Sequence, residues 1–174
     1  MPEFRTRQWI PYPIDEVFAF FAEARNLERI TPPFLRFSLC DSGVIPMREG
    51  TLIDYRLRLH GIPLHWRSMI EVWEPGRRFV DTQVRGPFQR WWHEHTFQEA
   101  PGGTWVEDRV QYKLPLGPLG QFAAGWWVAR DVRRIFEYRH RAIEQIFPPG
   151  GTEAAAPDTA PFAAQARDTS AAQA

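Results

Sequence analysis

The sequence predicts an α+β protein in which a curved antiparallel sheet of about seven strands wraps around one long C-terminal helix. Two observations support this fold class. Segments of alternating apolar and polar residues follow one another between residues 35 and 114, with short turns rich in Gly and Pro between them. After residue 120 the apolar period changes to that of a long amphipathic helix. A half-buried sheet must cover its apolar face, and only the last helix is long enough to do so.

The first elements follow from local sequence signals. Residues 3–10 alternate in polarity and predict a strand. Pro13 suits the first turn of a helix, and the helical spacing of 13–30 predicts one helix or two short ones. Pro32 and Pro33 then end the helical segment, because the residue before a proline avoids the helical conformation.

The remaining strands form a meander, since short Gly- and Pro-containing turns join them in sequence. They are expected at residues 35–40, 51–59, 64–73, 78–85, 89–99 and 104–114. The amphipathic pattern predicts the long helix over residues 121–147. The tail, residues 148–174, is small, polar and interrupted by proline, so we expect one domain over 1–147 followed by a disordered end.

The composition excludes several classes of function. Basic and acidic residues balance at 21 each, which gives no reason to expect nucleic-acid binding or stable membrane attachment. Cys40 is the only cysteine, so an intrachain disulfide and a Cys-based zinc site are excluded. The N-terminal residues lack the apolar run of a signal peptide, and no stretch approaches a membrane span. We expect a cytoplasmic protein.

The order of elements and several phrases resemble a known superfamily. The phrases are 30-ITPPFL-35, 50-GTLIDYRLRLHGIPLHW-66, 79-FVDTQVRGPFQRWWHEHTF-97 and 103-GTWVEDRVQYKLPLG-117. Over residues 3–147 the chain resembles the helix-grip fold of the START/Bet v 1-like superfamily, also called SRPBCC. It is similar to bacterial polyketide cyclase/dehydrase-like and lipid-transport-like proteins. Members include carriers, cyclases, hydrolases and sterol or quinone binders, so the resemblance implies no single activity.

Strand alternation assigns the candidate site residues to the inner face of the sheet. In 89–99 one side carries two histidines between large aromatic residues, and in 104–114 the apolar side carries Asp108. The pattern of 78–85 is ambiguous, but the resemblance implies that Phe79, Asp81 and Gln83 face inward. The candidate ligand-binding residues are Tyr55, Trp66, Ser68, Asp81, Gln83, Trp91, His93, His95, Phe97, Asp108, Tyr112, Trp126 and Phe136.

The sequence allows three interpretations of His93 and His95. They could form a structural network with Asp108 or Asp81, or the polar end of an apolar ligand pocket. They could also bind a metal, because the His-x-His pattern places two imidazoles on one side of a strand, and Asp108 or Asp81 could supply a third ligand. That pattern is weak evidence on its own, and nothing in the resemblance requires a metal. No metal site and no cofactor are therefore predicted.

The predicted function is the binding, and so the transport or sequestration, of a hydrophobic or aromatic small molecule between sheet and helix. Lipids, quinones, isoprenoids and polyketides all fit this class. The alternative is a cyclase/dehydrase-type enzyme, in which His93 or His95 moves protons, Asp108 orients the ring and Tyr55 or Tyr112 donates to a carbonyl. A third interpretation is an interaction module, in which exposed Trp73 or Trp92 would contribute to an aromatic patch or a homodimer surface.

Overall fold

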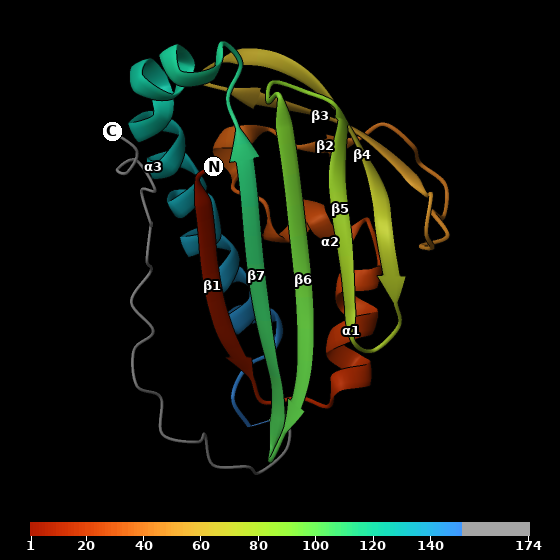
Figure 1. Cartoon of the computed structure of the whole chain (residues 1–174). Helices are drawn as coiled ribbons and strands as arrows, with labels where there is room; N and C mark the ends of the chain where they lie inside the picture. Colours follow the sequence, from red (N-terminus) through yellow and green to blue (C-terminus); the bar gives the residue numbers. More distant parts are fainter. Residues whose placement is uncertain (151–174) are drawn as a thin grey trace.

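In the computed structural model, which describes residues 1–150, seven strands form one antiparallel sheet with helices on one of its faces (Figure 1). The strands are β1 (Glu3–Ile10), β2 (Ser38–Leu39), β3 (Leu52–Leu59), β4 (Ile62–Glu74), β5 (Arg78–Arg85), β6 (Arg90–Ala100) and β7 (Gly103–Lys113). The helices are α1 (Ile14–Ala22), α2 (Asn26–Ile30) and α3 (Gly117–Ile146), with a 3-10 turn at Pro33–Leu35. The predicted fold class is confirmed. Residues 151–174, most of the predicted tail, lie outside the described residues.

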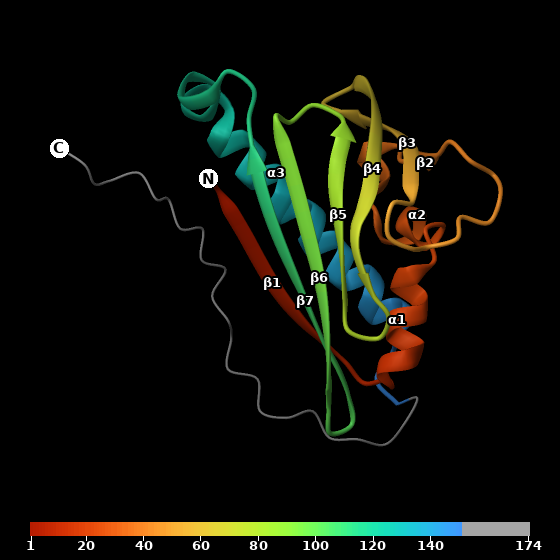
Figure 2. The same cartoon turned by 45° about the vertical axis from the view of Figure 1, so that its right-hand side comes forward.

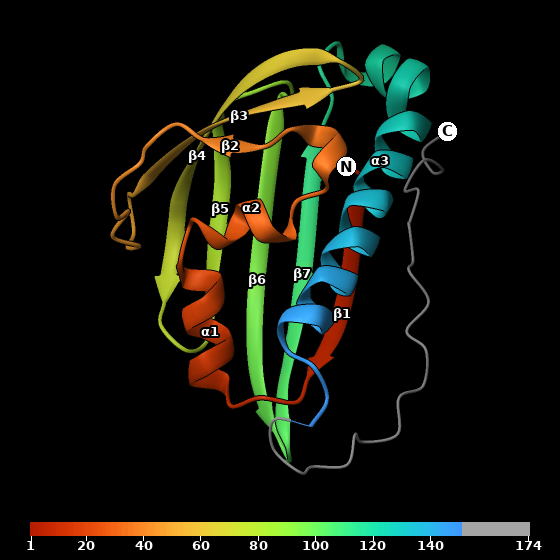
Figure 3. The same cartoon turned by 180° about the vertical axis from the view of Figure 1, so that it is seen from behind.

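The sheet has the order β1-β7-β6-β5-β4-β3-β2, and every pair of neighbours is antiparallel. The chain therefore starts at one edge, crosses to the other edge through α1 and α2, and returns as a meander. Figure 3 shows all three helices on the same face of the sheet, and Figure 2 shows α3 running diagonally behind the strands. Helix α3 packs against β1 and α2, while α1 packs against β6 and β7.

Two predicted boundaries differ from the structure because of proline. The strand expected at residues 35–40 shrinks to Ser38–Leu39, since Pro33 begins a 3-10 turn there. Helix α3 begins four residues earlier than expected, at Gly117, because Pro118 lies in its first turn. A helix tolerates proline in that turn, where the missing N–H has no intrahelical acceptor.

A register shift in β4 corrects the prediction that Trp73 is exposed. The pairing of β4 with β5 is irregular between Ile70 and Val72, so the strict alternation of faces is broken there. Trp73 consequently packs against the rings of Phe18 and Phe79, at centroid distances of 5.3 Å and 5.6 Å. Trp92, the other tryptophan expected at the surface, is half-buried below the Arg109 guanidinium. These two residues therefore do not form the exposed aromatic patch expected of them, and a homodimer stays a prediction.

Glu3 links the edge strand β1 to β7 by side-chain hydrogen bonds. Its carboxylate accepts hydrogen bonds from Arg5, from Arg109 (3.0 Å) and from Gln111 (2.7 Å). Partial burial by itself raises the pKa of Glu3, but the hydrogen bonds from Gln111, Arg5 and Arg109 outweigh it and lower the pKa from 4.5 to about 2. The ionised carboxylate therefore stabilises the folded state.

We expect Glu3→Gln to lower the free energy of unfolding at pH 7 by about 1 kcal/mol, since charges at this partly exposed site are screened. The folded pKa lies below the unfolded one, so the difference from wild type is full above pH 4.5 and disappears as the pH falls towards 2. Urea titrations at several pH values measure it. Glu99→Gln, at an exposed position of β6, is the control. A difference that does not change with pH contradicts the assignment.

Candidate functional site

Three neighbouring strands bring the candidate polar residues together. In the register of β5 with β6, Asp81 lies opposite His93, and in that of β6 with β7, His95 lies opposite Asp108. Since paired residues in adjacent strands point to the same face, all four side chains project from the inner face of the sheet. This agrees with the predicted inward orientation of Asp81, although the strand pattern alone was ambiguous there.

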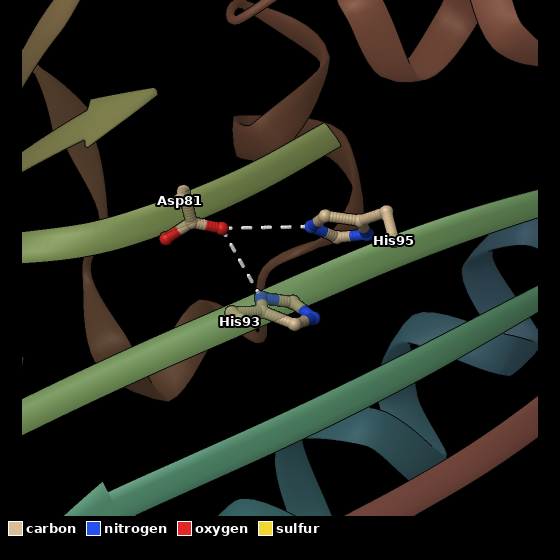
Figure 4. A group of neighbouring side chains, drawn as sticks. All are labelled: Asp81, His93 and His95. Carbon is tan, nitrogen blue, oxygen red and sulfur yellow. Dashed lines mark ion pairs between the residues drawn. The ribbon is translucent and has the colours of Figure 1, made fainter. Parts of the chain in front are cut away.

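The two histidines lie between the two carboxylates. His93 Nε2 is 2.9 Å from Asp108 Oδ1, and His95 Nδ1 is 2.8 Å from the same oxygen. The opposite nitrogens face Asp81 Oδ2, at 3.3 Å from His93 Nδ1 and 3.6 Å from His95 Nε2 (Figure 4). Each imidazole thus directs one nitrogen to each carboxylate. Both the structural and the pocket interpretation of the histidines are compatible with this geometry.

Aromatic rings fix the orientation of both imidazoles. The ring of His95 stacks on Phe79 at a centroid distance of 4.3 Å. The ring of His93 meets the edge of Phe136 from α3 at 5.5 Å. The two imidazole centroids are 3.9 Å apart, and the residues are only 5% and 4% exposed. Close packing of this kind leaves the rings little rotational freedom.

Arg139 on α3 adds a guanidinium to the cluster. Its Nη1 lies 3.6 Å from Asp108 Oδ1, and its guanidinium lies 5.0 Å from the Phe136 ring centroid. Arg139 is 8% exposed, and its buried Nε and Nη1 have no hydrogen-bond partner among the described residues. A buried guanidinium with unpaired N–H groups is costly, so its attraction to Asp108 and Phe136 offsets part of that cost.

The pKa values of the cluster move in the directions expected for ion pairs. Burial alone raises the pKa of Asp108, but the charges of both histidines and their hydrogen bonds lower it well below its ordinary value. The pKa of Asp81 is lowered in the same way. For His93, burial lowers the pKa, while hydrogen bonds to Asp108 and Asp81 raise it above its ordinary value. The carboxylates are therefore ionised and His93 favours its cationic form.

The cluster forms the polar end of a cavity of about 190 Å³ between the sheet and the helices. Apolar side chains from β3, β4, β6, α2 and α3 make up most of its wall. A second polar group lies in the same wall, where Ser68 Oγ is 3.2 Å from the Tyr55 hydroxyl and accepts a hydrogen bond from Trp66 Nε1 (3.1 Å). Burial raises the pKa of Tyr55 well above its ordinary value, so the hydroxyl stays protonated. It can donate a hydrogen bond inside an apolar space.

Most of the predicted ligand-binding residues line this cavity. They are Tyr55, Trp66, Ser68, Asp81, Trp91, His93, His95 and Phe136. Four others are near but do not line it: Gln83 bonds the backbone of Phe88, Phe97 packs in the core cluster of α1, Asp108 lies behind the histidines, and Tyr112 packs with Val110.

The prediction that Trp126 contacts a ligand differs from the structure. Trp126 is 66% exposed, and its ring meets Trp127 on the outer side of α3. The first turns of α3 extend past the sheet (Figure 1), so among the described residues the apolar side chains on its outer side pack against no other element. Exposed apolar residues gather in this segment: Leu116, Leu119, Phe122, Trp126 and Trp127.

Arg139 was not among the predicted site residues, although a signal for it exists. It lies three residues after Phe136 and four before Ile143, both of which belong to the predicted apolar face of the helix. This spacing places residue 139 on the buried stripe. A charged residue at such a position points to a buried partner, here Asp108.

Comparison with known families identifies the relationship. A family profile described as "Polyketide cyclase / dehydrase and lipid transport" matches residues 10–141. The chain belongs to this family. Its members are associated with the binding of hydrophobic ligands, in agreement with the resemblance seen in the sequence. A search of curated proteins gave no match.

Several solved structures have the same fold. A protein from Thermus thermophilus has 22% identity and a TM-score of 0.62, covering 87% of this chain and 100% of that one. A protein from Chromobacterium violaceum has 12% identity and a TM-score of 0.66, covering 86% and 99%. The ginseng major latex-like protein 151 from Panax ginseng, which is Bet v 1-like, has 13% identity and a TM-score of 0.60, covering 84% and 97%. At these identities the likeness shows the fold alone.

Among the described residues, none of the helices combines the length and the apolar character that a membrane span requires.

We expect Asp108→Asn to lower the free energy of unfolding by about 3–5 kcal/mol at pH 7, because it leaves Arg139 and the imidazoles without their buried anion. Asp54→Asn is the matched control. Asp54 pairs with Arg67 at 2.9 Å near the surface, so its loss should cost less than about 1 kcal/mol. Urea unfolding measures both. Equal, small effects of the two substitutions would show that the cluster contributes little to stability.

Proposed function

We propose that the protein binds a small hydrophobic or aromatic molecule in the cavity between the sheet and α3, and so carries or sequesters it. The observation that supports this proposal is an apolar cavity with two separate polar groups in its wall. Such a cavity suits a ligand with an apolar body and one or two oxygen functions. Membership of a family associated with hydrophobic ligands supports it independently.

The size of the cavity narrows the ligand class. Its volume of about 190 Å³ is below the roughly 300–1,000 Å³ of common ligand pockets. This favours a compact ligand of two or three rings over a complete membrane lipid. A ligand that buries about 200 Å² of apolar surface gains about 5 kcal/mol before the entropy costs of association. The polar groups then orient it and select its oxygen functions.

The proposal predicts that filling the apolar wall blocks binding. Leu57 on β3 lines the cavity, whereas Leu52 on the same strand is 48% exposed. We expect Leu57→Trp to weaken the binding of the neutral probe N-phenyl-1-naphthylamine at least tenfold, and Leu52→Trp to leave it unchanged. Fluorescence titration measures both affinities, and native mass spectrometry gives the stoichiometry. Equal affinities for the two variants, or no binding by wild type, would overturn the proposal.

An acid–base enzyme of the cyclase/dehydrase type is the second candidate function. The observation that favours it is that His93 and His95 line the cavity while Asp108 holds them from behind. In this function one imidazole moves a proton of a bound carbonyl compound, and the Tyr55 hydroxyl donates to the carbonyl oxygen. Tyr112, the other tyrosine considered for that role, does not line the cavity.

The enzymatic function predicts turnover that depends on a single imidazole. His95→Ala should abolish conversion of an aromatic polyketide-like substrate, while circular dichroism and binding of the neutral probe are retained. Liquid chromatography with mass detection follows the product. Turnover that persists in both His93→Ala and His95→Ala excludes the acid–base role of the imidazoles. A wild type that binds such substrates without converting them excludes the enzymatic function and leaves binding alone.

A further inference from the structure

We propose that Asp81, His93 and His95 form a binding site for a divalent first-row transition-metal ion at the polar end of the cavity. Their ligand atoms, Asp81 Oδ2, His93 Nδ1 and His95 Nε2, all lie within 4.8 Å of one another. Figure 4 shows both imidazoles turned towards the same carboxylate oxygen. The site does not depend on the apolar ligand proposed above.

The distances between these atoms suit a common metal ion. The oxygen is 3.3 Å from His93 Nδ1 and 3.6 Å from His95 Nε2. Ligands at 2.0–2.2 Å from a tetrahedral Zn²⁺ are separated by about 3.3–3.6 Å, which is the same range. The third separation, between His93 Nδ1 and His95 Nε2, is within 4.8 Å.

Asp108 prepares the two imidazoles as ligands. Its Oδ1 accepts a hydrogen bond from His93 Nε2 at 2.9 Å, and His95 Nδ1 lies 2.8 Å from the same oxygen, although not aligned for a hydrogen bond. In the metal-bound form a proton on each of these nitrogens leaves the lone pairs of His93 Nδ1 and His95 Nε2 directed at the ion beside Asp81. Binding of the ion therefore displaces the second proton of His93, and we expect binding to weaken as the pH falls. A carboxylate behind a ligating imidazole is the usual outer partner in metal sites.

The charges around the site allow a metal ion to bind. Arg139 lies 3.6 Å from Asp108 Oδ1, so the outer carboxylate is already balanced. The negative charge of Asp81 is therefore available to the ion. Asp81 also lines the cavity, and its side chain is 18% exposed. Two imidazoles and one carboxylate are ligands suited to Zn²⁺, Fe²⁺ or Co²⁺.

Three protein ligands leave a coordination position free. All three residues line the cavity, so this position faces the space in which an apolar molecule would lie. A carbonyl, hydroxyl or carboxylate oxygen of that molecule would complete the coordination. The expectation from sequence that no metal binds rested on the weakness of the His-x-His pattern and on a resemblance that requires no metal. The strand register that brings Asp81 opposite His93 is the observation that the sequence could not supply.

The test uses the full chain stripped of metal with EDTA and then titrated with Zn²⁺ or Co²⁺ alone. We expect one equivalent to bind with a dissociation constant below about 10 μM, and Co²⁺ to give the intense visible absorption of a low-coordinate site. Asp81→Asn and His95→Gln should each weaken binding at least tenfold. His65→Gln is the control, because His65 forms a surface pair with Asp54 at 3.1 Å. It should leave the affinity unchanged.

Three results would overturn the proposal: no stoichiometric binding, equal binding by Asp81→Asn and wild type, or loss of binding in His65→Gln. If Asp81→Asn does not fold by circular dichroism, proton NMR of the wild-type Co²⁺ form decides. Two exchangeable imidazole N–H signals should be paramagnetically shifted, one from each histidine, and fewer than two contradict the site. Binding of N-phenyl-1-naphthylamine by the metal-free protein is measured separately, so failure of the metal site and failure of the proposed function are distinguishable.

Discussion

The buried carboxylate of Asp108 is the interaction on which the rest of the structure depends. It lies on β7, faces both histidines of β6 and approaches Arg139 of α3. A buried anion is tolerated only with such partners, so the charge fixes the orientation of two rings and the position of the helix at once. The position of α3 over the sheet and the polar end of the cavity therefore both depend on the Asp108 carboxylate.

The cavity separates two kinds of recognition. Its apolar wall comes largely from β3, β4 and α3, whose side chains make non-directional contacts. Its polar end comes from β5 and β6, whose antiparallel register holds Asp81 opposite His93. Hydrogen bonds and metal coordination depend on angles, so they belong on central strands, whereas dispersion contacts tolerate displacement.

Alternation of residues was sufficient to predict the sheet, the inner face and the inward direction of His93 and His95. It could not show that Asp81 and Asp108 lie on either side of the histidines, because that depends on strand register. The helical spacing of apolar residues predicts Trp126 in the cavity, but this spacing continues along α3 beyond the edge of the sheet, where Trp126 is exposed. Strict alternation predicts Trp73 on the outer face of the sheet, because a local register shift in β4 cannot be seen in the sequence. The positions of all four residues depend on long-range geometry and not on local sequence preference.

Helix α3 is attached to the rest of the protein unevenly. Along β1 it is held by the ring of Phe4 against Phe136 and by Gln8, which donates to the backbone oxygen of His140. On the side of the β3–β4 turn, the described polar contact is the exposed pair of His60 with Asp131. This flank also packs against α2. The apolar wall on α3 and the polar end on β5 and β6 belong to different elements, so under the proposed binding function a substitution on the helix can change the size of the cavity while β5 and β6 keep their alignment.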